Sequence, residues 1–236
     1  MKRLVSAPSE TKYCSETLLG NGASSNLGTW TSFSTAITSV GELYYCLPRV
    51  LQGTDECNRV GNQLSPTSCK VKLDICVSDI LDNNSMDITV HVFFLTCPQV
   101  KSLNNYTAIP ITTLLAKGDG TNVGFDGTQI AAQYPVNTAE FKIIKHRKFR
   151  LMKGFGQAIS AAALDAVNSQ TTQYVHIEQR IPLPKKLKYE VNSSVYPTNA
   201  APFMCIGWTR NNADPGAVSN SFIKVLGQVQ LRYKDE

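Results

Sequence analysis

The sequence predicts an all-β fold, built as a single antiparallel sandwich. From Cys69 to Val77 every second residue is apolar and the residues between them are mostly charged, a period of two that is typical of a strand with one buried face. Residues 90–95 form a continuous apolar run, which indicates a strand buried inside a sandwich. With 42% hydrophobic and 17% charged residues in 236 positions, the chain can bury a large core.

The remaining elements follow from strand-like patterns separated by turn residues. The expected strand segments are 12–19, 29–40, 42–47, 69–79, 86–96, 141–153, 174–181, 203–209 and 222–233. Short helices are expected at 109–115 and 157–168, both inside long loops. About eight strands joined by long crossover loops favour an eight-stranded jelly roll over an immunoglobulin-like sandwich.

We expect one domain preceded by a short arm. Residues 1–11 are polar, contain Lys2 and Arg3, and are interpreted as a flexible N-terminal arm. Residues 12–236 contain no linker-like stretch, and no second hydrophobic core is expected within them. Six residues serve as the test of the predicted core, because each lies in an alternating or buried apolar run: Leu73, Ile75, Val90, Val92, Ile206 and Val229.

The loop at residues 52–62 is polar and leads into the long alternating strand. Gly53 and Gly61 can take backbone angles closed to other residues, so the loop can be tight. Arg59 has five N–H donors, and we expect it to cross-link carbonyl groups of its own loop or of an adjacent subunit. Gln52, Gly53, Arg59 and Gly61 are therefore candidate loop-structuring and assembly residues.

The most distinctive chemical feature is a basic strand at residues 142–153. Its six cations exceed the net charge of +5 of the whole chain, and it has no acidic residue: Lys142, Lys145, Arg147, Lys148, Arg150 and Lys153. Lys148, Arg150 and Met152 should share one face, and Arg147, Phe149, Leu151 and Lys153 the other. One hypothesis is a phosphate-contacting surface. The alternative is a solvated sheet edge kept soluble by lysine.

Catalytic and metal-binding patterns are absent from the sequence. The three histidines and seven cysteines occur at no catalytic or zinc-finger spacing, and His91 is interpreted as a satisfied core or interface histidine. Asp79, Asp82 and Asp87 crowd one turn without the ligand spacing of a calcium loop. We expect no enzyme activity, no cofactor, no metal, reduced thiols and no membrane partner, with the cytosol or nucleus as the compartment before assembly.

The block Q-G-T-x-x-x-x-R-V-G-N at residues 52–62, followed by a long strand, resembles capsid proteins of small circular single-stranded DNA viruses of the circovirus-like group. Supporting passages are PQVKSL, GDGT, PVNTAEFKIIKHRKFRL, KKLKYE and GQVQLRYKDE. The resemblance implies a jelly-roll subunit that assembles with copies of itself, about 60 in the smallest icosahedral shell. It further implies circular single-stranded DNA as cargo, a virion location, and a host receptor of unknown identity.

The sequence departs from that family at its N-terminus. The family begins with a long arginine-rich arm, whereas here only Lys2 and Arg3 are present. About 60 copies at +5 each supply on the order of 300 charges, fewer than the phosphates of a genome that must exceed about 700 nucleotides. Either the arm has been removed or shortened, which we favour, or other cations neutralise the DNA. Lys2, Arg3 and the basic strand are the candidate nucleic-acid-binding residues.

Two other functions share the predicted fold. A coat protein of a small positive-strand RNA virus also uses a jelly roll, and digestion of packaged nucleic acid by DNase or RNase would distinguish the two. A non-viral, lectin-like binding module is the second alternative. Glycan affinity without particle formation would favour it.

Overall fold

The structure is a computed structural model that describes residues 11–20, 26–33, 35–55, 57–77, 87–152, 174–211 and 223–235. Its strands are β1 (Thr11–Thr17), β2 (Thr31–Phe33), β3 (Tyr44–Tyr45), β4 (Gln63–Val77), β5 (Asp87–Thr96), β6 (Leu115–Ala116), β7 (Asn122–Val123), β8 (Lys142–Met152), β9 (Tyr174–Arg180), β10 (Leu187–Lys188), β11 (Pro202–Arg210) and β12 (Ile223–Asp235). Four short 3-10 helices occur between them: η1 (Val40–Glu42), η2 (Leu103–Ala108), η3 (Ile111–Thr113) and η4 (Ala131–Gln133).

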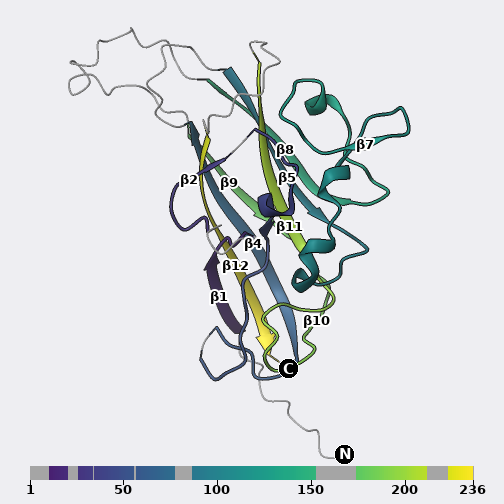
Figure 1. Cartoon of the computed structure of the whole chain (residues 1–236). Coiled ribbons are helices and arrows are strands. Elements are labelled where there is room, and N and C mark those ends of the chain that lie inside the picture. The colour runs from purple at the N-terminus through teal and green to yellow at the C-terminus, as the bar shows by residue number, and fades with distance from the viewer. Residues whose placement is uncertain are drawn as a thin grey trace, which may run out of the picture.

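The strands form two main sheets (Figure 1). The first sheet has the order β1-β12-β4-β10, with β2 also on β12 and β9 also on β4. The second sheet has the order β3-β11-β5-β8. All pairings within both sheets are antiparallel.

The pairing is nested along the chain. The outermost strands, β1 and β12, pair with each other, and inside them β3 pairs with β11, β4 with β9, and β5 with β8. Successive pairs alternate between the two sheets. A long hairpin wound in this way is a jelly roll. The fold class expected from the sequence, an all-β jelly-roll sandwich with long loops and short inserted helices, is confirmed.

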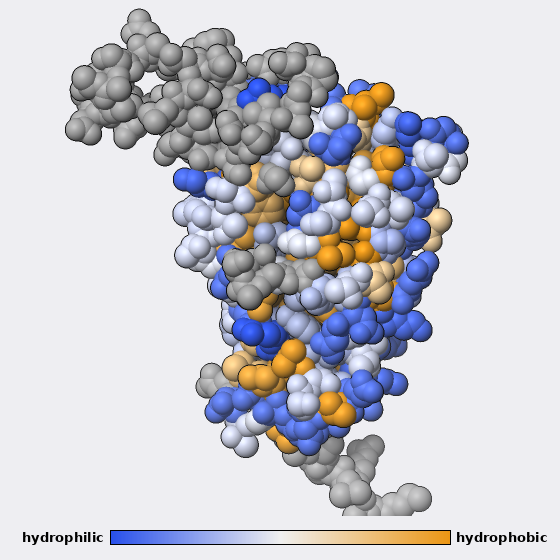
Figure 2. All heavy atoms as spheres, viewed as in Figure 1, coloured by the Kyte–Doolittle hydropathy of each residue, from blue (hydrophilic) through white to orange (hydrophobic). Residues whose placement is uncertain are grey.

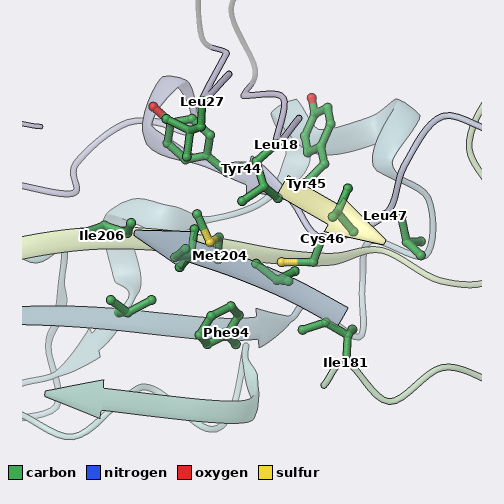
Figure 3. Packing of buried hydrophobic residues seen from close by; sticks show 14 of the residues in the cluster. Leu18, Leu27, Tyr44, Tyr45, Cys46, Leu47, Phe94, Ile181, Met204 and Ile206 are labelled. Carbon is green, nitrogen blue, oxygen red and sulfur yellow. The ribbon is translucent and has the colours of Figure 1, made fainter. Parts of the chain in front are cut away.

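The main core lies between the two sheets. All six predicted core residues belong to its cluster of buried side chains, each no more than 1% exposed. The second sheet contributes Phe94 from β5 and Met204 and Ile206 from β11 (Figure 3). Leu18 and Cys46 belong to the same cluster. Since truncation of one such side chain to alanine costs about 2–5 kcal/mol, this layer supplies much of the stability.

A second apolar cluster covers the other face of the second sheet. Phe93 and Leu95 alternate with the inward residues of β5 and pack against Ile37 and Phe125. The covering layer comes largely from residues 98–140, which connect β5 to β8 (teal in Figure 1). The expectation of no second hydrophobic core is therefore wrong, because β5 is buried on both faces.

The first sheet leaves its outer face to solvent. Lys70 on β4 pairs with Glu178 on β9, and both side chains are more than two fifths exposed. The polar positions of the alternating strand predicted from the sequence lie on this face. In the view of Figure 2, hydrophobic residues reach the surface in separate groups among polar ones.

Several element bounds differ from those expected. β4 begins at Gln63 rather than Cys69, because Leu64 to Ser68 already pair with β12 across a register shift. Among the described residues of 29–40 only Thr31–Phe33 form a strand, since the chain then crosses to the layer that covers the second sheet, where Ile37 forms an isolated bridge with Phe125. The helix expected at 109–115 is the short η3, and the one at 157–168 lies outside the described residues.

Residues 1–10 of the expected N-terminal arm lie outside the described residues, and its last residue, Thr11, is instead the first residue of β1. The division into arm and domain stays a prediction. The seven cysteines are all free thiols in the structure.

Candidate functional site

The loop at residues 51–62 closes on itself through backbone contacts. Gln52 and Arg59 form a parallel bridge, with the Arg59 N–H donating to Leu51 O (2.8 Å) and the Gly53 N–H donating to Arg59 O (3.0 Å). The Gln52 side chain donates to Val60 O at 3.0 Å. The loop is therefore a compact, internally bonded unit rather than an open connection.

Gly53 and Gly61 do not act as the sequence predicted. The described glycines with positive φ are Gly118, Gly120 and Gly127, so neither loop glycine needs the left-handed region. Gly53 instead leaves room for Asn58, because a Cβ atom there would lie 2.6 Å from Asn58 Nδ2 and that side chain would have to shift. That asparagine in turn donates to the Asp55 carboxylate at 3.0 Å.

The Arg59 guanidinium joins two segments distant in the sequence. Within its own loop Nη1 donates to Gly61 O (2.7 Å) and Asn62 Oδ1 (2.8 Å). Nη2 lies 3.0 Å from each of three carbonyl oxygens of the 191–194 turn: Val191, Asn192 and Ser194. The expected bond to a carbonyl of its own loop is present, and its role in assembly stays a prediction.

Arg59 is fully buried although no carboxylate is bonded to it. Its side chain is 0% exposed, and its guanidinium carbon lies 4.2 Å from the centre of the Tyr189 ring. Burial lowers the pKa of Arg59, an effect opposed by nearby Tyr189 and by the charge of Asp235. Carbonyl dipoles and an aromatic face thus replace water around the cation.

The terminal strands hold the same loop from the other side. Asp235 on β12 accepts from the Val60 N–H (2.7 Å) and pairs with Lys12 of β1 (3.1 Å). Lys12 also donates to Asn58 O at 2.8 Å. Sequence reasoning missed Lys12 and Asp235, because two charges 223 positions apart carry no local signal that they meet.

The basic strand is β8, the edge of the second sheet, whose partner among the described residues is β5. The predicted division of faces is confirmed for the residues that can be compared. Leu151 is buried in the main core and Phe149 packs against it, whereas Lys148 and Arg150 lie on the opposite face and are exposed. The cations are therefore spread over both faces of an edge strand.

Three of the cations are bonded within the chain. Arg150 makes a two-pronged ion pair with Asp87 on β5, and Arg147 donates to Gln179 Oε1 and to Glu178 O on β9. Lys148 Nζ donates to Ala132 O at 3.2 Å. The sequence showed no acidic neighbour within the segment, but the cross-strand partner Asp87 supplies one.

Two exposed lysines, Lys142 and Lys145, have no side-chain partner among the described residues. Lys2, Arg3 and Lys153 lie outside those residues. The structure thus separates cations bonded within the chain from those available to a ligand, although contact with nucleic acid stays a prediction for all of them.

Metal and membrane chemistry gain no support from the described residues. No group of three or more His, Cys, Asp or Glu side chains there could hold a metal ion. Asp87 is bonded to Arg150 and Asn211, and Asp79 and Asp82 are outside the described part of the chain. No described helix has the length and hydropathy needed to cross a membrane.

His91 differs from the expectation of a satisfied core histidine. It is buried as predicted, at 1% exposure, and its Nδ1 lies 3.3 Å from His146 Nε2. Its other ring nitrogen, Nε2, is buried without a hydrogen-bond partner among the described residues. Buried polar atoms usually have partners, so this unbonded nitrogen is an exception within the described part of the chain.

Comparison with known proteins finds a likeness among solved structures. No protein-family model and no curated protein matches the chain. Among solved structures, a chain from "Israeli acute paralysis virus heated to 63 degree - full particle" matches with 12% identity and a TM-score of 0.28, covering 98% of this chain and 68% of that chain. The fold assignment therefore rests on the strand pairing of the chain itself: it is an antiparallel jelly roll.

Proposed function

We propose that the chain is a structural capsid subunit that assembles with copies of itself into an icosahedral shell around a circular single-stranded DNA genome. The nested pairing of β1 with β12 through β5 with β8 carries this proposal. It supports the jelly-roll subunit implied by the sequence block at residues 52–62. Because jelly rolls serve several functions, the proposal needs both the topology and the sequence resemblance.

The clamp around Arg59 supports an assembly role for its loop. Five hydrogen bonds fix the guanidinium between residues 59–62 and 191–194. The loop at residues 51–62 and the 191–194 turn carry exposed apolar side chains, and each is more than half exposed: Leu51, Val60 and Val191. A loop that is already ordered loses little conformational entropy when a neighbouring subunit binds it.

The nucleic-acid cargo is supported by the cations that remain available. Lys142 and Lys145 are exposed on the edge strand, and in this proposal they contact phosphates together with Lys148 and the residues of the arm. Contacts to phosphate carry no base information, so the binding would be insensitive to sequence. The compartments proposed are the virion and, during assembly, the host nucleus or cytoplasm, with no enzymatic step and no cofactor.

Negative-stain electron microscopy of the purified chain tests the shell. Closed particles of uniform diameter are expected, and their nucleic acid should resist nuclease until the shell is opened, then be digested by DNase and not by RNase. RNase-sensitive cargo would instead favour an RNA-virus coat protein. A monomer or small oligomer that binds glycans and forms no particles under any assembly condition would refute the proposal.

A further inference from the structure

A polar hollow lies on the outer face of the second sheet, where β5, β8 and β11 meet the residues around η4. Its volume is about 360 Å³. The teal segment that contains η4 packs beside these strands in Figure 1. The lining consists of Thr89, His91, Gln129, Ala132, Gln133, Lys148, Thr209 and Asn211. It contains one formal positive charge, no carboxylate and a single alkyl side chain.

His91 lines this hollow and has a buried ring nitrogen that lacks a partner among the described residues. Its Nδ1 faces His146 Nε2, and its ring packs against Phe93 and Phe125 with centroids 6.0 Å and 5.2 Å away. Nε2 is the ring nitrogen left over, buried and unbonded among the described residues. An unpaired buried polar group is destabilising, and a bound ligand would remove that penalty.

The lining offers several donors that are not used within the described part of the chain. The Thr89 hydroxyl is already bonded to Asn211 Oδ1 (2.9 Å), and the Gln129 amide N–H groups are directed to Arg210 O and Asn211 O. Lys148 uses one of its three N–H groups, on Ala132 O. Neither the Gln133 amide nor the Thr209 hydroxyl has a partner within the described part of the chain. Four groups can therefore donate to a ligand: Lys148, Gln133, Thr209 and His91.

Charge at the hollow also favours an anion. One carboxylate is bonded to a lining residue: Asp87 Oδ1 accepts from Asn211 Nδ2 at 2.7 Å. Both oxygens of Asp87 are bonded to the Arg150 guanidinium on β8, so this negative charge is already compensated. The Lys148 charge is the one left uncompensated at the lining.

We propose that this hollow is a binding site for a phosphate group, held by the Lys148 ammonium, the Gln133 amide, the Thr209 hydroxyl and His91 Nε2–H. The site is separate from the Arg59 loop and does not depend on the proposed capsid function. A phosphate oxygen accepts several hydrogen bonds at once, which matches a set of convergent donors around a single cation.

The histidine pair provides the proton arrangement that such a ligand requires. Burial, then His146 and Lys148, lower the pKa of His91 to about 3, and burial, then Lys148, lowers the pKa of His146 to about 4. Both rings are therefore neutral at pH 7, and one proton is shared between His91 Nδ1 and His146 Nε2. When His146 Nε2 carries that proton, His91 Nε2 must carry its own and can donate to phosphate. An anion would select this pair of tautomers.

The test is equilibrium dialysis of the full chain against radiolabelled inorganic phosphate, with ionic strength held constant by sodium chloride. Saturable uptake at one site per chain is expected. Lys148→Gln and Thr209→Val should each weaken phosphate affinity about tenfold, since each removes a hydrogen bond to a charged group. His91→Phe keeps an aromatic ring against Phe93 and Phe125 and should have the same effect. Each variant is included only if its circular dichroism matches that of the wild type.

Lys101→Gln is the control, because Lys101 is exposed and does not line the hollow. It should leave phosphate affinity within about twofold. Uptake that never saturates, or an equal loss in Lys101→Gln and Lys148→Gln, would overturn the proposal in favour of diffuse attraction by surface cations.

A second probe distinguishes two sources of the phosphate group. Displacement of labelled phosphate by deoxythymidine 5′-monophosphate at similar or lower concentration would support the site and assign it to a nucleotide phosphate. Displacement by unlabelled phosphate alone would support it as a site for free phosphate. Displacement by neither would show that the measured uptake does not come from a site and would refute the proposal.

Discussion

Arg59 illustrates how a cation can be buried without an ion pair. Its two terminal nitrogens contact five oxygens, four of them backbone carbonyls, and Tyr189 covers its face. Transfer of a charge out of water is costly unless each lost hydrogen bond is replaced. Only a planar fork with several donors can reach two turns at once in this way.

Arg59→Lys should therefore destabilise the fold. An ammonium group keeps the charge but has three donors on one atom, so part of the carbonyl set would lose its partner. We expect a loss of about 2–4 kcal/mol in the free energy of unfolding, measured by urea denaturation, and a lower yield of assembled particles. Arg180→Lys is the control, because Arg180 is exposed on β9. Equal unfolding midpoints for Arg59→Lys and the wild type would show that the clamp is dispensable.

The histidine pair predicts a loss of stability in mild acid. The folded pKa values of His91 and His146, about 3 and about 4, lie below the ordinary value of 6.5. The unfolded chain therefore binds more protons than the folded chain below pH 6.5, and stability falls as the pH decreases from about 6.5 toward 4. The slope is up to about 1.4 kcal/mol per pH unit for each histidine.

Thermal unfolding between pH 7 and pH 4 measures this effect. His146 lies near Lys148 and stacks on Phe93. Replacing His146 with Phe removes one of the two histidines but keeps a ring against Phe93. The decline in stability between pH 7 and pH 4 should therefore be less steep in this variant. His176→Phe is the control, since His176 is exposed on the outer face of the first sheet. If His146→Phe and the wild type decline with the same slope, other groups dominate the acid response.

At the scale of elements, the second sheet differs from the first because it is covered on both faces. Gly207 on β11 makes this possible, since a Cβ atom there would lie 2.6 Å from two ring carbons of Phe125. The Phe125 ring therefore rests directly on the sheet backbone and holds the covering segment at residues 98–140. A glycine within a strand weakens the strand but permits this close approach.

Gly207→Ala should loosen that covering segment. The added methyl group would push Phe125 outward, at a cost of about 1–3 kcal/mol, and amide hydrogen exchange should accelerate in residues 98–140 more than in the first sheet. Gly41→Ala serves as the control, because the nearest atom to its added Cβ would be Ser39 Oγ at 3.4 Å. Unchanged exchange in the covering segment would mean that Phe125 can shift without consequence.

At the scale of the whole molecule, the distribution of charge decides where a polyanion can bind. Arg150 and Arg147 are bonded to groups of this chain, whereas Lys142 and Lys145 on β8 have no side-chain partner in the described ranges. Replacing both lysines with Gln should lower affinity for single-stranded DNA and reduce the salt slope by about 1.4, since two phosphate contacts are lost.

Fluorescence anisotropy with two oligonucleotides of unrelated sequence, over a series of salt concentrations, measures both quantities. The double variant Lys101→Gln/Lys234→Gln changes the same net charge at exposed positions elsewhere and should have a smaller effect. An equal effect of the two double variants would indicate that binding follows net charge, with no contribution specific to the basic strand.

The sequence alone determined the fold class, most of the strands and the buried face of each long strand. The alternation from Cys69 to Val77 and the apolar run at 90–95 are local signals, and every predicted core residue is buried. Such signals suffice because a strand's buried face depends on a period of two within a few residues.

Tertiary structure decided which residues distant in the sequence contact one another, because local patterns carry no information about such contacts. Three interactions join residues that are 63 to 223 positions apart in the sequence. Arg59 bonds to the 191–194 turn, Lys12 pairs with Asp235, and Arg150 pairs with Asp87. The unbonded nitrogen of His91 emerges only where three strands and η4 meet. Each of these depends on which segments the nested pairing brings together, and that is a property of the whole chain rather than of any one stretch.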